Sequence, residues 1–205
     1  MANVGQPRDP VEEFEFRVAC QFAGLRKAAQ KAGCLLKPPD MPAHSFGRGG
    51  MEHEVWHDKP GGRYWKATFP GKAGCGPFGF YTPAGYLRRM RLTNLVFGDD
   101  LRFEGILARR EGLSIVTSQP YIQPHPERFI PTEEEIEGCL AALGFAISED
   151  TGHWERDDGV ILGDAHDRNF IRAPDECLYV IDVQPKLRPG CAWETVRAFP
   201  RGGER

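Results

Sequence analysis

The chain has 205 residues, enough for one domain that buries about 70% of its unfolded surface without a disulfide or metal. Its hydrophobic content of 40% and charged content of 27% are ordinary for a soluble globular protein. The net charge of −3 supplies no basic surface for nucleic acid or for an anionic membrane, so we expect neither as a partner.

Targeting signals are not predicted. The first residues contain neither the basic segment nor the apolar segment of a secretory signal, and no apolar run reaches the length of a membrane span. The six cysteines include no C-x-x-C pair. We therefore expect reduced thiols and a cytoplasmic protein.

The first third of the chain predicts one helix and one hairpin. Apolar residues recur at helical spacing over residues 11–33, and Gly33 ends the pattern. The proline- and glycine-rich segment 37–50 is predicted to be irregular. Residues 52–58 and 63–69 then predict two strands, and the turn residues 59–62 join them as a hairpin.

The rest of the chain predicts an α+β order of elements. The glycine-rich segment 70–83 is predicted to be a mobile loop, and residues 84–97 a helix. Residues 101–109 and 113–122 predict an antiparallel pair. A helix is predicted from Thr132 to Leu143, where Thr132 and Glu135 form a capping box and Gly144 follows. Two short apolar strands are predicted within residues 159–187.

Residues 53–57 read H-E-x-x-H, which on a helix binds zinc in hydrolases. Glycines and a proline flank this stretch, and Val55 and Trp56 favour a strand. In a strand, His53 and His57 would lie roughly 13 Å apart at about 3.3 Å per residue, too far for one zinc ion. We interpret them as residues of an exposed strand, and a zinc hydrolase stays a minor alternative.

A stronger pattern for chemistry lies near the C-terminus. Asp164 and Asn169 stand five residues apart in "GDAHDRNFI", and Asp182 follows in "YVIDVQ", where we expect an apolar strand to direct it outward. Phosphoryl transfer uses one carboxylate to accept the proton of the attacking hydroxyl. An amide oxygen and a second carboxylate suit magnesium. His166 and Arg168 either contact the phosphate acceptor or brace this loop, and we favour the bracing role.

Candidate residues for binding a nucleotide precede Asp164 in the sequence, in the order expected of a phosphoryl-transfer site. Lys66, in the second strand of the hairpin, is placed to reach the α- and β-phosphates. Three glycines before the hairpin would let backbone approach the phosphates: Gly47, Gly49 and Gly50. Segment 118–122 ends a strand and is expected to link two lobes, where an adenine edge meets the backbone. Its candidate contacts are Ser118, Gln119 and Tyr121.

These motifs resemble the protein-kinase-like superfamily, and most closely the kinase domain found in polyvalent proteins of phages and mobile elements. The motifs are "GMEHEV", "YWK" ending at Lys66, "YLRRMRLTNLVFGDDLRFEG", "IVTSQPYI", "GDAHDRN" and "VIDV". The resemblance covers about residues 45–187. The D-x-H-x-x-N form of residues 164–169 is also similar to aminoglycoside and choline kinases.

The resemblance implies a single compact, bilobal, kinase-like domain over residues 1–205. Residues 1–119 would form an N-terminal helix and a β-rich lobe, residues 120–205 a reduced C-terminal lobe, and ATP would bind between them. Lys66 would bind phosphates, Asp164 would be the catalytic base, and Asn169 and Asp182 would hold Mg²⁺. The implied activity is ATP- and magnesium-dependent phosphoryl transfer to a hydroxyl of a protein or small molecule.

The sequence also departs from the kinase pattern. Kinases pair the strand lysine with a glutamate on the next helix, but residues 84–97 contain no Asp or Glu. Glu52, Glu54 and Glu104 are the substitutes, and we select Glu52 because it lies nearest the glycines. Only 23 residues (205 − 182) follow Asp182. A pseudokinase or nucleotide-binding interaction module without turnover is therefore the main alternative.

Overall fold

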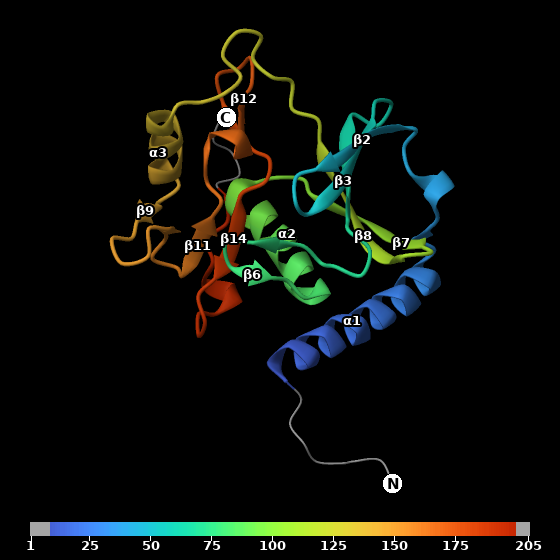
Figure 1. The fold of residues 1–205 in the computed structure, drawn as a ribbon. Helices are drawn as coiled ribbons and strands as arrows, with labels where there is room; N and C mark the ends of the chain where they lie inside the picture. The colour runs from blue at the N-terminus through green and yellow to red at the C-terminus, as the bar shows by residue number, and fades with distance from the viewer. Residues whose placement is uncertain (1–8, 200–205) are drawn as a thin grey trace. The chain divides into compact units, whose positions relative to one another are not determined.

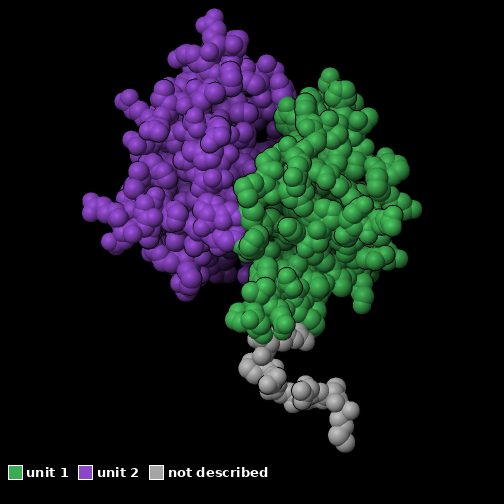
Figure 2. Space-filling view, viewed as in Figure 1, with its two compact units in different colours: residues 1–75, 80–86, 102–118 green, residues 76–79, 87–101, 119–205 purple. Residues whose placement is uncertain are grey.

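A computed structural model describes residues 9–199, whose elements group into two compact units (Figure 2). Unit 1 consists of Met1–Cys75, Phe80–Tyr86 and Arg102–Ser118. Unit 2 consists of Gly76–Gly79, Leu87–Leu101 and Gln119–Arg205. Three α-helices and several sheets occur in the described part, so the predicted mixture of helices and strands is confirmed. None of the helices described is both long and apolar enough to cross a membrane.

Unit 1 is built on a six-stranded sheet with the order β1-β7-β8-β4-β3-β2 (Figure 1). Its strands are β1 (Leu35–Leu36), β2 (His44–Gly49), β3 (His53–Asp58), β4 (Arg63–Thr68), β7 (Arg102–Arg109) and β8 (Gly112–Pro120). β1 pairs with β7 in parallel, whereas β2–β3, β3–β4 and β7–β8 are antiparallel. Both predicted strand pairs, β3–β4 and β7–β8, are confirmed.

Helix α1 (Pro10–Ala32) contacts β1 and β7 of this sheet. Asp9 caps its first turn by accepting a hydrogen bond from the Val11 N–H at 2.8 Å. Gly33 ends it in the left-handed conformation at φ 74°, which costs little without a Cβ. The apolar positions Val18, Phe22 and Ala29 are buried. The predicted helix is therefore confirmed, with its boundaries shifted by one residue.

The prediction that residues 37–50 are irregular is wrong. They contain a 3₁₀ turn at Pro38–Asp40 and the strand β2, which pairs with β3. The pairing register shifts between Ser45 and Gly47, and Gly47 has φ 74°. A glycine at such a bulge lets the strand continue, so the glycines do not end it here. The predicted loop 70–83 likewise contains short strands, β5 (Cys75–Gly76) and β6 (Gly79–Phe80).

One face of the unit 1 sheet is packed into a core of Trp56, Ala67, Leu107 and Val116. Trp56 and Ala67 lie one residue away from Val55 and Lys66 along β3 and β4. Because successive side chains of a strand point to opposite faces, Val55 and Lys66 lie on the other face. Both are only partly buried.

Unit 2 contains most of helix α2 (Pro83–Phe97), helix α3 (Glu133–Ala142) and two small sheets (Figure 1). One sheet has the order β14-β11-β10-β9, and the other pairs β12 with β13. The strands are β9 (Ala146–Ile147), β10 (Trp154–Glu155), β11 (Val160–Gly163), β12 (Phe170–Arg172), β13 (Leu178–Val180) and β14 (Gln184–Leu187). Short 3₁₀ turns occur at Asp167–Asn169 and Trp193–Thr195.

The core of unit 2 joins the helices to the strands. Leu92 and Val96 of α2 pack with Leu140 of α3 and with Val160 and Leu162 of β11. The predicted capping box of α3 is confirmed, because Thr132 Oγ1 accepts from the Glu135 N–H and Glu135 Oε2 accepts from the Thr132 N–H. The helix predicted at 84–97 is also confirmed, with its start at Pro83.

Residues 159–187 form four strands, so the prediction of two strands is wrong. β14 has the sequence QPKL, whose polar residues and proline hide a strand from a search for apolar runs. Asp182 is not inside a strand as predicted, because β13 ends at Val180 and β14 starts at Gln184. It lies in the bend between them.

Candidate functional site

In unit 2, pairing of short strands brings two polar segments together. Segment 164–169 joins β11 to β12, and segment 181–183 joins β13 to β14. Gly163 pairs with Gln184 at one end, and Phe170 pairs with Val180 at the other. The Ile181 N–H also donates to the Asn169 carbonyl at 2.9 Å. Asp164, Asn169 and Asp182 thus belong to two neighbouring segments, although 18 residues separate Asp164 from Asp182 in sequence.

Asp164 has a strained backbone that its neighbours hold in place. Its φ is 60°, a left-handed conformation that costs a residue with a side chain about 1–3 kcal/mol. Its carbonyl accepts hydrogen bonds from Asn169 Nδ2 at 2.7 Å and from the His166 N–H at 3.2 Å. Its carboxylate Oδ1 lies 3.3 Å from His166 Nε2, and the side chain is 36% exposed. The carboxylate is therefore oriented by protein groups and still open to solvent.

Asn169 is buried, with an exposure of 9%. Its side-chain amide nitrogen contacts other residues of the segment 164–169. Nδ2 donates to the Asp164 carbonyl and lies 3.3 Å from His166 Nε2. The amide oxygen Oδ1 takes no part in these contacts. An amide oxygen and the Asp182 carboxylate are both hard oxygen donors, so this pair fits a magnesium ion by ligand type.

The contacts of His166 within the segment 164–169 favour the bracing role over contact with an acceptor. Its side chain Nδ1 accepts from the Arg168 N–H at 3.3 Å, while Nε2 faces both the Asp164 carboxylate and the Asn169 amide. One imidazole thus contacts both ends of the segment 164–169.

In unit 1, Lys66 lies on the partly exposed face of the sheet. It pairs with Val55, and strand alternation places Tyr64, His57 and His53 on the same face. An aromatic group lies two residues away from Lys66 on this face. The His57 and Tyr64 ring centroids are 4.8 Å apart, and Phe46 of β2 stacks on His57 at 6.2 Å. The face therefore carries a cation beside a set of flat rings.

The three candidate glycines lie in β2 and in the turn that follows it. A Cβ on Gly49 would come within 2.3 Å of Val55 Cγ2, so only glycine fits there without movement. Gly50, in the turn, has φ 77°. Because Val55 shares a face with Lys66, the Gly49 backbone packs against the side of the sheet that carries the lysine.

The carboxylates considered as partners of Lys66 differ in the face that they occupy. Glu54 alternates with Val55 and makes an ion pair with Arg109 at 2.8 Å. Glu104 accepts a hydrogen bond from the Ser118 hydroxyl. The buried Glu52 accepts from the Cys75 N–H at 2.8 Å, and its Oε2 lies 3.7 Å from His53 Nε2.

The position of Ser118 separates these three carboxylates. Arg63, next to Tyr64 in β4, donates from Nε to Ser118 Oγ at 2.7 Å and from Nη2 to the Ser118 carbonyl at 3.2 Å. Ser118 and Glu104 therefore lie on the face opposite Lys66, as Glu54 does. Because His53 shares the face of Lys66, the Glu52 carboxylate is the one of the three placed on that side.

The segment after Ser118 is the predicted place for an adenine edge. The Gln119 amide donates to Asp99 Oδ2 at 3.1 Å and to the Val180 carbonyl at 3.0 Å. Pro120 has no N–H. Tyr121, the next residue with a backbone N–H, is 37% exposed. Sequence reasoning missed Arg63 and Asp99, because only strand pairing and packing bring them to these positions.

Residues 53–57 do not form the helix that an H-E-x-x-H zinc site requires, because β3 is a strand. The minor zinc alternative is therefore wrong. The interpretation of both histidines as exposed is also wrong, since His53 is only 2% exposed and its Nε2 lies 2.9 Å from the Tyr86 hydroxyl. The hydroxyl of Tyr86 lies a further 3.4 Å from Thr117 Oγ1, so His53 belongs to a buried polar contact.

Comparison with known proteins identifies a family. The model of a family described as serine/threonine/tyrosine kinases found in polyvalent proteins matches residues 20–189, which is 170 (189 − 20 + 1) of the 205 residues. No curated protein and no solved structure matches the chain. The predicted resemblance is confirmed, and the match also includes part of α1. The likeness to aminoglycoside and choline kinases stays a prediction.

Proposed function

Because the chain belongs to the family of serine/threonine/tyrosine kinases found in polyvalent proteins, we propose that it transfers the γ-phosphoryl group of ATP to a hydroxyl group. The family description favours a serine, threonine or tyrosine hydroxyl of a protein as the acceptor. A small-molecule hydroxyl is the other acceptor class compatible with the proposed chemistry.

The observation that carries the proposal is the braced segment 164–169 beside segment 181–183 in unit 2. Asp164 accepts the proton of the acceptor hydroxyl while that oxygen forms a bond to the γ-phosphorus. The bond from the γ-phosphorus to the β–γ bridging oxygen breaks, and ADP leaves with the electron pair. His166 keeps the Asp164 carboxylate in orientation during this step.

Two oxygen donors of unit 2 are proposed to hold magnesium. Asn169 binds through Oδ1, since Nδ2 is used by the Asp164 carbonyl, and Asp182 binds through its carboxylate. Magnesium, when bound there with the nucleotide, neutralises negative charge that develops on the phosphate oxygens. Asn169 also fixes the Asp164 backbone, so one residue would link the metal to the base.

Residues of unit 1 are proposed to bind the nucleotide. Lys66 binds phosphate oxygens, and the backbone of Gly47, Gly49 and Gly50 approaches them. Glu52 is the proposed carboxylate partner of Lys66, because its side chain lies on the lysine's side of the sheet. The Tyr121 N–H is the proposed adenine contact. Ser118 and Gln119 are further proposed adenine contacts through their backbone, since their side chains bond to other protein groups.

Thermal unfolding with a non-hydrolysable ATP analogue tests this proposal. We expect the analogue to raise the Tm of the wild type only when magnesium is present, and Asp182→Ala to remove that magnesium-dependent rise. Asp175→Ala, an aspartate in the turn between β12 and β13, is the control and should keep it. A wild type whose Tm responds to no nucleotide would overturn the proposal.

A nucleotide-binding module without turnover is the second candidate. Helix α2 provides no acidic residue in its first turn, and the sequence 83–97 contains no Asp or Glu to pair with Lys66. This candidate predicts the same magnesium-dependent rise in Tm, but no ADP production with protein or small-molecule acceptors. Measured ADP release that Asp164→Asn abolishes would exclude it.

A further inference from the structure

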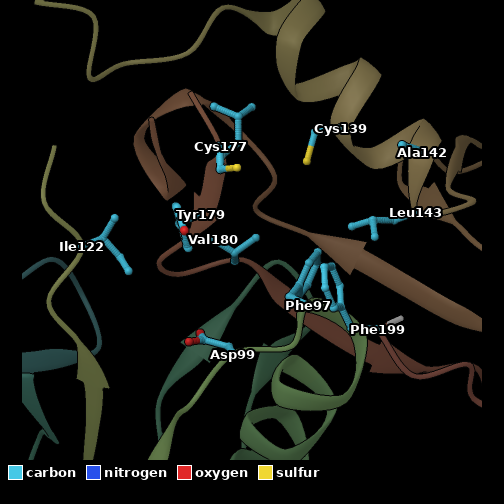
Figure 3. A pocket seen from close by; sticks show the side chains of 11 residues that line it. Phe97, Asp99, Ile122, Cys139, Ala142, Leu143, Cys177, Tyr179, Val180 and Phe199 are labelled. Carbon is cyan, nitrogen blue, oxygen red and sulfur yellow. The ribbon is translucent and has the colours of Figure 1, made fainter. Parts of the chain in front are cut away.

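A cavity of about 250 Å³ in unit 2 has no part in the proposed phosphoryl transfer. Figure 3 shows it between helix α3 and the β12–β13 hairpin, with Phe97 and Phe199 on the opposite side from Cys139. Most of its lining is apolar, and its one carboxylate, Asp99, accepts a hydrogen bond from Gln119. The rest of its chemical character comes from two thiols and three rings: Cys139, Cys177, Phe97, Phe199 and Tyr179.

The two thiols face the same space. Cys139 comes from α3 and Cys177 from the turn before β13, and Figure 3 shows both sulfur atoms directed into the cavity. Neither cysteine is in a disulfide, and both are only partly exposed. Burial and the nearby Cys177 raise the pKa of the Cys139 thiol. It therefore stays protonated near neutral pH and forms a soft, weakly polar surface.

The size and the lining of the cavity select a class of ligand. An apolar cavity of about 150 Å³ binds benzene, so about 250 Å³ accommodates roughly one or two fused rings. Aromatic rings contact sulfur favourably and stack against other rings. The Tyr179 hydroxyl donates to Asp175 Oδ2 at 3.1 Å, which holds one ring of the lining in a fixed orientation.

We propose that this cavity binds a small, uncharged, flat aromatic molecule of one or two fused rings. The ligand lies between the two thiols and the rings of Phe97 and Phe199. An aliphatic molecule of the same volume gains neither the sulfur–aromatic nor the ring–ring contacts, so it binds more weakly.

Strand β13 connects this cavity to segment 164–169. Tyr179 and Val180 line the cavity, and Val180 pairs with Phe170 of β12. The next residue, Ile181, donates its N–H to the Asn169 carbonyl, while the Val180 carbonyl accepts from Gln119 Nε2.

A ligand packed against β13 opposes the local opening of this strand. We therefore expect slower hydrogen exchange of the Ile181 amide when the cavity is filled.

Protection from alkylation by N-ethylmaleimide tests the proposal, with indole as the aromatic probe. Peptide mass spectrometry follows modification of Cys177 and of Cys20, an exposed cysteine on α1 that reports general reactivity. At an indole concentration about ten times its Kd, about one molecule in eleven has an empty cavity, so Cys177 should react about tenfold more slowly. Cys20 should react at an unchanged rate. Equal rates at Cys177 with and without indole overturn the proposal.

Two matched variants locate the binding. Ala142 lines the cavity, so Ala142→Phe places a ring at its edge, whereas the neighbouring Ala141 is not among the lining residues. We expect Ala142→Phe to abolish the protection of Cys177 by indole and Ala141→Phe to preserve it. Cyclohexane-based alcohols should protect less than indole. Full protection in Ala142→Phe, or an Ile181 amide that exchanges equally fast with and without indole, would contradict the proposed site.

Discussion

The two regions that hold the candidate residues are organised in different ways. In unit 1, regular strand alternation decides which groups share a face, so Lys66, Val55 and His57 are placed by the register of β3 and β4. In unit 2, segment 164–169 is irregular, and hydrogen bonds from His166 and Asn169 hold it. We therefore expect unit 1 to be most sensitive to changes in side-chain size. Segment 164–169 of unit 2 should be most sensitive to the loss of single polar groups.

The largest expected effect is in the irregular segment. Asp164→Asn keeps the side-chain shape and a residue that tolerates a positive φ, but removes the carboxylate that accepts the proton. If Asp164 is the base, phosphoryl transfer should fall by about 10²- to 10⁴-fold while the Tm stays close to that of the wild type. Initial rates of ADP release and a thermal unfolding curve measure both quantities.

The exposed neighbour Asp167 supplies the control for this prediction. Its Oδ1 accepts from the Arg168 N–H at 2.8 Å. Asp167→Asn should therefore leave the transfer rate within a few-fold of the wild type. An equal loss of activity in the two variants would show that Asp164 is not the catalytic base. It would also contradict the expectation that single polar groups of segment 164–169 differ in their importance.

A smaller effect is expected from shape in unit 1. Gly49→Ala brings a methyl group within 2.3 Å of Val55 Cγ2, and such overpacking costs about 1–3 kcal/mol of unfolding free energy. Gly24→Ala is the matched control, because nothing lies within 4 Å of a Cβ at Gly24 in α1. It should be neutral or stabilise the protein by about 0.5–1 kcal/mol. Urea unfolding measures both.

The double variant Gly49→Ala/Val55→Ala tests the stated cause. Removing the valine methyl groups makes room for the new side chain, so the double variant should lose less stability than the sum of the two single variants. Additive losses would show that the Gly49–Val55 contact is not what limits this position.

The smallest effect is a pH dependence of stability in unit 2. The hydrogen bond from Arg172 lowers the pKa of Glu135 from its usual 4.5 to about 2. Because the folded pKa lies below the unfolded one, this group stabilises the fold above pH 4.5, and its contribution is lost as the pH falls from 4.5 to 2. Urea unfolding of Glu135→Gln should thus depend less on pH in this window than that of the wild type. Glu134→Gln, at the exposed neighbouring position, should follow the wild type.

Much of the local structure could be predicted from the sequence, because it depends on neighbouring residues. The cap at Gly33, the capping box of Thr132 and Glu135, and the turn at residues 59–62 involve groups within a few positions of one another. Asp164, Asn169 and Asp182 could be selected for the same reason, since carboxylate and amide groups next to apolar strands form a recognisable pattern. The order of motifs was also enough to identify the kinase family, which the match over residues 20–189 confirms.

Pairing between distant residues decided the rest. Strand β14, with its polar QPKL sequence, exists because it pairs with β11, and this pairing helps to bring Asp182 beside segment 164–169. The sheet register likewise places His53 on the side of Lys66, where the Glu52 carboxylate approaches it, whereas the contact with Arg63 places Ser118 on the other side. The sequence by itself determined which chemical groups are present and which local turns they favour. Only the tertiary structure decided which of them share a face, because a strand's side chains alternate and its register is set by a partner far away in the chain.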